Sequence, residues 1–173
     1  MSETILRAAT PADIPAISAL AIETFVAKFA ALYSPQDLEA FLTECLSETA
    51  VASDMADPAQ VYQLAEKDGM LIGYCKIGLT CSFPQHARGS KVMELKQLYA
   101  ASAATGQGIG TLMMDWAMDQ FARRGADEVQ LSVYAENYGA HRFYERYGFG
   151  KVADITFKVG EQLDPEFLFA RML

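Results

Sequence analysis

A short glycine-rich stretch carries the clearest chemical signal in the chain, Thr105-Gly106-Gln107-Gly108-Ile109-Gly110-Thr111. It follows a predicted strand and opens a predicted helix, whose first backbone N–H groups have no hydrogen-bond partner within the helix. Such donors bind phosphate, and glycine lets the backbone approach an anion where a side chain would block it. The stretch therefore predicts an anion-binding turn, although the same glycines also fit a flexible connection between a strand and a helix.

The spacing of these glycines excludes two common phosphate-binding motifs. A dinucleotide-binding G-x-G-x-x-G motif would need its third glycine at Thr111 if counted from Gly106, or at Met113 if counted from Gly108. A P-loop needs a Gly-Lys-Ser/Thr sequence, which the chain lacks. Neither a Rossmann-type nor a P-loop nucleotide site is predicted.

The glycine-rich stretch is preceded by Glu94-Leu95-Lys96-Gln97-Leu98-Tyr99 and followed by Asn137 and Phe143-Tyr144-Glu145-Arg146-Tyr147-Gly148-Phe149. This combination, from Glu94 to Phe149, resembles the GCN5-related N-acetyltransferase (GNAT) family. The family's Q/R-x-x-G-x-G/A loop maps onto residues 105–110, and its asparagine followed by an F-Y-x-x-x-G-F helix maps onto Asn137 and residues 143–149. Thr105 departs from this pattern because it stands where the family has Gln or Arg. This departure predicts altered cofactor contacts without loss of the site.

The resemblance implies an α/β fold, a GNAT-like single domain over residues 4–173 with a central, mostly antiparallel mixed sheet flanked by helices. It also implies acetyl-CoA as co-substrate, with the pantetheine arm beside residues 98–100 and the pyrophosphate on the amides of residues 106–111. The residues implied to contact it are Leu98, Tyr99, Ala100, Thr105, Gly106, Gln107, Gly108, Ile109, Gly110, Thr111, Asn137 and Tyr144. Asn137 also has the position of an N-cap for a helix beginning at Tyr138.

Acetyl transfer to an amine needs a neutral nucleophile, yet a lysine-like amine has a pKa near ~10.4 and is protonated at pH 7. A general base acting through water would supply the neutral form. Glu94 holds the position of a strand glutamate that some members of the resembling family use as this base. An ordinary surface glutamate on an alternating strand has the same pattern, and Glu23, Glu136 or a backbone-bound water are alternatives.

Two further catalytic roles come from the resemblance. The backbone N–H of Leu98 would donate to the oxygen that becomes negative during transfer. Tyr144 would hydrogen-bond the leaving sulfur without fully transferring its proton, because a phenol with a pKa near ~10 is a weaker acid than a thiol near ~8.5. Tyr144 also fits a core tyrosine, since it shares an apolar face with Phe143 and Tyr147.

Composition limits the class of partner. The net charge of -8 argues against a nucleic-acid or anionic-membrane surface. Residues 1–60 hold nine acids against two bases, so an acidic N-terminal third is consistent with a cationic acceptor or with simple solvation of helix faces. The longest apolar stretches fall short of the ~18 residues of a membrane helix and the N-terminus lacks a basic signal-peptide region, so we expect a cytoplasmic protein. Three cysteines without C-x-x-C spacing encode no zinc site, and no metal is predicted.

Cap, turn and periodicity signals predict the elements that position these residues. The Asp68-Gly69 dipeptide predicts a tight hairpin. The expected strands cover residues 5–8, 61–67, 70–80, 92–99, 129–133, 151–157 and 167–172, with a loop at 160–165 before the last strand. The expected helices cover residues 10–29, 35–46, 109–124 and 138–147.

The resemblance implies an acetyl-CoA-dependent N-acetyltransferase that acts on a primary amine by direct attack, and the acidic N-terminal third adds the hypothesis that the acceptor is a polyamine or a peptide amine. Phe25, Phe29 and Tyr33 would offer faces for cation–π contact with such an acceptor. The alternatives are a non-catalytic acyl-CoA-binding or regulatory module and an interaction domain that binds no CoA. A homodimer paired through its sheets is left open by the sequence.

Overall fold

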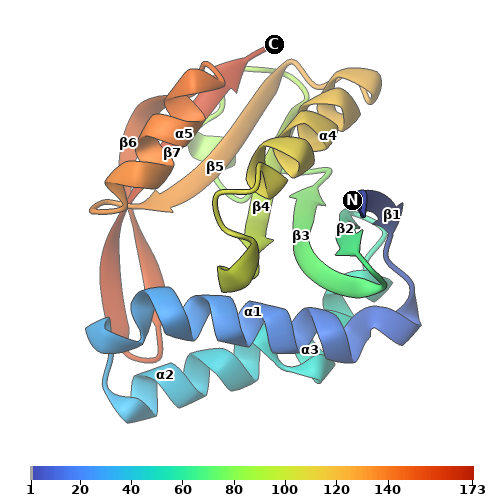
Figure 1. Cartoon of the computed structure of the whole chain (residues 1–173). Helices are drawn as coiled ribbons and strands as arrows, with labels where there is room; N and C mark the ends of the chain where they lie inside the picture. Colours follow the sequence, from blue (N-terminus) through green and yellow to red (C-terminus); the bar gives the residue numbers. More distant parts are fainter. Residues whose placement is uncertain (1) are drawn as a thin grey trace.

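A seven-stranded sheet organises the molecule, as described for residues 2–173 by a computed structural model (Figure 1). Its spatial order is β1-β2-β3-β4-β5-β7-β6, and every neighbouring pair is antiparallel except β4 and β5. The strands are β1 (Ile5–Ala8), β2 (Gln60–Lys67), β3 (Met70–Gly78), β4 (Val92–Ala100), β5 (Glu128–Tyr134), β6 (Gly150–Val159) and β7 (Gln162–Met172). The predicted mixed, mostly antiparallel sheet is confirmed.

Helices cover both faces of this sheet because successive strand residues point to opposite sides. Leu64 and Tyr74 pack with the N-terminal helices, whereas their neighbours Ala65 and Cys75 pack beneath a later helix. The first layer holds α1 (Ile14–Phe29), α2 (Pro35–Phe41) and α3 (Glu48–Ala56). The second holds α4 (Ile109–Arg123), and α5 (Tyr138–Arg146) packs at its margin, as seen in Figure 1.

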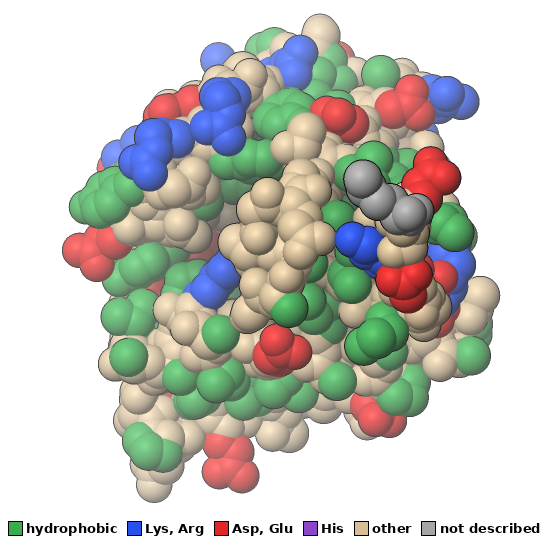
Figure 2. Space-filling model, viewed as in Figure 1, with side chains coloured by type: hydrophobic (Ala, Val, Ile, Leu, Met, Phe, Trp, Pro, Cys, Tyr) green, Lys and Arg blue, Asp and Glu red, His purple; other side chains and the backbone are tan. Residues whose placement is uncertain are grey.

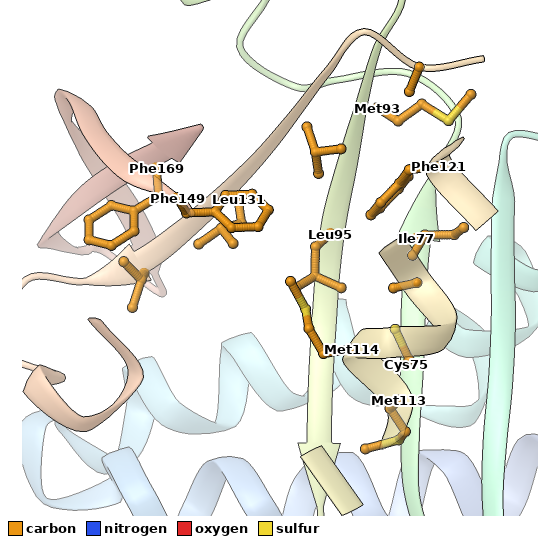
Figure 3. Packing of buried hydrophobic residues seen from close by; sticks show 14 of the residues in the cluster. Cys75, Ile77, Met93, Leu95, Met113, Met114, Phe121, Leu131, Phe149 and Phe169 are labelled. Atoms are coloured by element: carbon orange, nitrogen blue, oxygen red, sulfur yellow. The ribbon is translucent and has the colours of Figure 1, made fainter. Parts of the chain in front are cut away.

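The core under α4 fixes the position of the glycine-rich turn that precedes this helix. Met113, Met114 and Phe121 are fully buried on one face of α4 and lie over strand residues that include Ile77 and Leu95 (Figure 3). Gly73 contributes close packing, because a Cβ there would lie 3.0 Å from the Met113 Cε atom and 2.9 Å from the Tyr99 carbonyl oxygen. The helix is therefore held firmly against β3 and β4.

Parallel pairing between β4 and β5 is short. It covers only Val92–Glu94 on β4 and Glu128–Gln130 on β5, and just beyond it the β3–β4 register shifts by one residue near Lys96. A bulge of this kind bends a strand. Figure 1 shows β4 and β5 diverging from this point toward α1. Residues 96–99 of β4 and 132–134 of β5 line a cavity there.

Most predicted elements are confirmed, including the hairpin turn, in which Asp68 and Gly69 have φ values of 54° and 75°. Helix α3 was not predicted, because it follows an N-cap Ser47 but carries few buried residues to mark a helical period. The predicted loop at 160–165 is wrong: β7 begins at Gln162 and contains Pro165. Proline is tolerated there because β5 pairs with β7 only as far as Glu166, so Pro165 lies past the end of that ladder.

One prediction about apolar stretches is also wrong. A continuous helical segment from Pro11 to Leu32 has 22 residues and is apolar enough to cross a membrane by length and composition alone. Its apolar character has a packing explanation, because Ile17, Leu20, Ala21 and Phe25 are buried against the sheet and neighbouring helices.

Candidate active site

Three adjoining cavities follow the cleft where β4 and β5 diverge. We call them the loop cavity (about 480 Å³), which the glycine-rich turn lines, the central cavity (about 180 Å³) and the outer cavity (about 740 Å³). The loop and central cavities share Leu98, Asn137 and Tyr144 as walls, and the central and outer cavities share Gln97 and Tyr99. Figure 2 shows a hollow on this face between α5 and the turn before α4.

The glycine-rich turn exposes backbone to the loop cavity. Gly106 and Gly108 have φ values of 80° and 77°, and a Cβ added at either would meet no atom within 4 Å. The first helical hydrogen bond of α4 runs from the Leu112 N–H to the Gly108 carbonyl at 3.0 Å, so the N–H groups of residues 109–111 precede the helical ladder. Open space and free donors fit a bound diphosphate.

One residue of the predicted cofactor set, Gln107, differs from its neighbours in this turn. The N–H of Gln107 donates to the Ala104 carbonyl at 3.3 Å and its side-chain amide donates to the Ala103 carbonyl at 3.0 Å, and Gln107 does not line the loop cavity. Thr105 does line it, with an exposed side chain. The structure therefore brings together the predicted loop residues other than Gln107.

The end of β4 presents alternating residues to the two ends of the cleft. Leu98 and Ala100 line the loop cavity, whereas Tyr99 lines the central and outer cavities. The Ala101 N–H donates to Ile72 on β3 at 2.8 Å. Because N–H direction alternates along a strand, the N–H of Leu98 faces the opposite edge, toward the cleft. The donor role of the Leu98 N–H stays a prediction.

Asn137 and Tyr144 enter the cleft from α5. The Asn137 side chain accepts a hydrogen bond from the Ala140 N–H at 3.3 Å, so it caps the helix as predicted, and it also lines the loop and central cavities. Tyr144 lies between the same two cavities and packs edge-on against Phe143 and Phe149. Burial raises the pKa of the Tyr144 phenol above its ordinary value, which keeps it a neutral hydrogen-bond donor.

Glu94 is buried outside the walls of the three cavities. One oxygen of its carboxylate accepts hydrogen bonds from the Ser82 N–H at 2.8 Å and the Ser82 hydroxyl at 2.7 Å, and lies 3.3 Å from the Lys96 ammonium. The two alternative carboxylates do not line the central cavity either. Glu23 is exposed on α1, and Glu136, which accepts from the Tyr134 hydroxyl at 2.9 Å, lines a neighbouring cavity that shares Tyr134 and Asn137 with it.

Polar side chains from distant segments line the outer cavity. Asp54 of α3 forms an ion pair with Lys76 of β3, and the exposed Glu44 lies on the same wall. Of the aromatic residues predicted to meet a cation, Phe25 and Phe29 line the central cavity, while Tyr33 stacks on Phe25 and donates its hydroxyl to Asp164.

Comparison with known proteins agrees with this geometry. The family model described as "Acetyltransferase (GNAT) family" matches residues 26–149. The chain belongs to the GNAT family. The aminoalkylphosphonate N-acetyltransferase of Salmonella typhimurium is 30% identical over 144 residues, which are 83% of each chain. An uncharacterized N-acetyltransferase of Lactobacillus delbrueckii subsp. lactis is 24% identical over 165 residues, which cover 93% of this chain and 92% of the relative.

A solved structure shows the same fold over the whole length. The PaiA N-acetyltransferase of Thermoplasma acidophilum, crystallised with coenzyme A, aligns with a TM-score of 0.78 at 19% identity and covers 99% of both chains. Together with the named N-acetyltransferase relatives, the family match identifies this GNAT protein as an acetyl-CoA-dependent acyltransferase.

Two residues in the cleft of this GNAT protein were missed by sequence reasoning. Lys28 of α1 lines the loop and central cavities, where an ammonium group favours phosphate, and it is one of only two basic residues in the acidic segment 1–60. Glu166 of β7 lines the central cavity. Its sequence signal is weak, because it follows Pro165 and precedes the predicted start of the last strand.

Proposed function

We propose that this protein transfers the acetyl group of acetyl-CoA to a primary amine by direct attack, without a covalent enzyme intermediate. One observation carries the proposal: the loop cavity at the glycine-rich turn and the outer cavity both adjoin the central cavity, the first sharing Leu98 and Tyr144 with it and the second sharing Tyr99. Two substrates entering from opposite ends would therefore meet at the central cavity. This arrangement favours in-line transfer between them.

Different residues of the loop cavity would bind different parts of the cofactor. The free N–H groups at the start of α4 would hold the pyrophosphate, with Gly106 and Gly108 allowing close approach. Leu98 and Ala100 would lie along the pantetheine arm, which carries the thioester. Asn137 would contribute from the start of α5, where its side chain also caps the helix. Acetyl-CoA supplies the activated acetyl group for transfer.

At the point of transfer, backbone and phenol donors would stabilise the charges that develop. The Leu98 N–H faces the cleft and would donate to the acetyl oxygen as it becomes negative. The Tyr144 hydroxyl would donate a hydrogen bond to the departing sulfur. Its raised pKa makes full proton transfer to a thiolate unfavourable, so hydrogen bonding is the proposed role.

For the acceptor, we propose a cationic amine, either a polyamine or a peptide amine. The supporting features are Glu44 on the outer wall and the rings of Phe25 and Phe29 in the central cavity. A screen with spermidine, an alanyl peptide and 2-aminoethylphosphonate tests this choice by following release of CoA thiol. A preference for the phosphonate, the class for which the Salmonella relative is named, would reject it.

The second candidate is a non-catalytic acyl-CoA-binding module, which the threonine at position 105 favours because the family has Gln or Arg there. Two experiments separate the two functions: calorimetry measures CoA binding, and the amine screen measures release of CoA thiol. Tight CoA binding without thiol release from any amine would establish the binding module. Absence of CoA binding would instead favour an interaction domain.

We propose that residues 4–173 act as one domain, supported by a single sheet whose strands run from Ile5–Ala8 to Gln162–Met172. We also propose a cytoplasmic protein that uses no metal and binds neither nucleic acid nor membrane, supported by the net charge of -8. Light scattering, which measures the mass in solution, tests whether two copies pair through their sheets.

A further inference from the structure

Glu166 lines the central cavity, which lies between the loop cavity and the outer cavity. It stands on β7 directly opposite Tyr134 of β5, and it lines the central cavity together with Leu98 and Tyr144. Its Oε2 atom is buried and has no hydrogen-bond partner among residues 2–173. A buried carboxylate oxygen without a donor is costly, so its presence beside the transfer point calls for a function.

Neighbouring carboxylates do not share this property. Asp164, two residues earlier on β7, receives hydrogen bonds from the Tyr33 hydroxyl and, at 2.8 Å, from the Gln162 side chain. Glu94 receives two hydrogen bonds from Ser82. Glu166 is therefore the carboxylate with unused acceptor capacity on the wall of the central cavity.

The surroundings of Glu166 also suit proton exchange near neutral pH. Burial, reinforced by the negative charge of Asp164, raises the pKa of Glu166 to about 7, while the Ser132 hydroxyl acts in the opposite direction. Charged and titratable groups face it from every neighbouring element: Lys28, Tyr33, Lys96, Tyr99, Tyr134, Tyr144 and Asp164. A base that titrates near the working pH is the most effective kind.

We propose that Glu166 is the general base that deprotonates the acceptor ammonium; this inference rests on the proposed acetyl transfer. The carboxylate takes one N–H proton, which leaves a neutral amine and a carboxylic acid. The amine nitrogen then bonds to the acetyl carbon while the carbon–sulfur bond breaks, and a second N–H proton passes to the sulfur beside Tyr144. Loss of the proton from Glu166 to water restores the carboxylate.

The test compares three glutamate-to-glutamine variants. Glu166→Gln removes the proposed base, Glu94→Gln removes the carboxylate that sequence resemblance favours, and Glu161→Gln is a matched control because it is exposed on the same β6–β7 hairpin. Release of CoA thiol is followed from pH 5.5 to 9, with whichever of spermidine or the alanyl peptide the wild type acetylates faster. Circular dichroism and calorimetry with CoA verify folding and cofactor binding for each variant.

We expect Glu166→Gln to lower kcat/KM by about 10²- to 10³-fold and to remove the rise in rate centred near pH 7. Glu161→Gln should match the wild type, Glu94→Gln should lose less than about tenfold, and CoA affinity should stay within about twofold throughout. A folded Glu166→Gln variant that keeps its rate and its pH profile would overturn the inference, as would a larger loss in Glu94→Gln.

Failure of the acetyl-transfer proposal gives a different result from failure of the role of Glu166. If the wild type releases thiol with none of the amines, both the acetyl-transfer proposal and the role of Glu166 fall. If the wild type turns over and Glu166→Gln does so equally well, only the role of Glu166 falls. Carbon-13 NMR of the glutamate carboxyls gives an independent test. We expect one carboxyl resonance to titrate near pH 7 in the wild type and to be missing in Glu166→Gln.

Discussion

At one end of the cleft, backbone groups of a single continuous segment, residues 104–111, form much of the loop cavity. At the other end, side chains from α3, β3, β4 and β6 line the outer cavity. A backbone site is encoded by glycines at fixed spacing and tolerates variation in side chains. A side-chain site depends on residues as distant in the chain as Asp54 and Phe157, so its composition is set by tertiary packing and not by a local motif.

The same contrast holds for charge. The turn before α4 presents exposed N–H groups that need no ionised residue, whereas the central cavity buries the Glu166 carboxyl. Burying a charged group raises the free energy of the folded state, so the free energy of unfolding depends on pH.

The largest effect should be on stability. The pKa of Glu166 rises from 4.5 to about 7 on folding, so the folded state holds its proton more tightly. The free energy of unfolding should therefore fall as pH rises from 4.5 to 7, by at most about 3 kcal/mol, and should level off above that. Urea unfolding at pH 5 and pH 8 measures this fall in the free energy of unfolding. In Glu166→Gln this fall should disappear, and an unchanged fall would mean that the cleft does not bury this charge.

Next in size is the effect of Gly108→Val on the cofactor side. A β-branched residue at a φ of 77° is strained, and its side chain would occupy the space proposed for the pyrophosphate. We expect CoA affinity by calorimetry to weaken by about 10- to 100-fold. Gly69→Val is the control, because Gly69 has a φ of 75° and equally open surroundings in a hairpin outside the cleft. It should cost stability and leave CoA affinity unchanged.

Tyr144→Phe should lower kcat by about tenfold while leaving acetyl-CoA affinity within about twofold, since its proposed hydrogen bond strengthens as sulfur leaves. Steady-state thiol release and calorimetry separate the two quantities. Tyr147→Phe is the matched control, because the Tyr147 hydroxyl bonds Asp115 at 2.7 Å outside the cavity walls. Equal rates for wild type and Tyr144→Phe would assign Tyr144 to packing.

The smallest effect should come from Thr105→Gln, which restores the residue typical of the family. The backbone supplies most of the binding, so one added side-chain hydrogen bond should tighten CoA binding by about threefold, or ~0.7 kcal/mol. A gain of a hundredfold would show that side chains, and not backbone amides, dominate recognition at this end.

Much of the fold was predictable because its signals are local. Asp68-Gly69 adopts the positive φ values that a tight hairpin requires, and Asn137 caps α5 within three residues of its position. The π-helical segment Leu42–Leu46 and α3 were harder to anticipate, because α3 buries only Val51 and so lacks a clear period. Local propensity is a weak guide where packing decides.

The sequence by itself determined the conformation of the glycine-rich turn, since Gly106 and Gly108 act through backbone conformation within a few residues of each other. Only the tertiary structure decided the chemistry opposite that turn. Divergence of β4 from β5 opens the cleft, and the pairing of β7 with β5 carries Glu166 into the same cavity as Leu98, 68 residues away in the chain. No spacing rule connects these positions, because strand order and burial place them together and burial sets the acidity of the carboxyl.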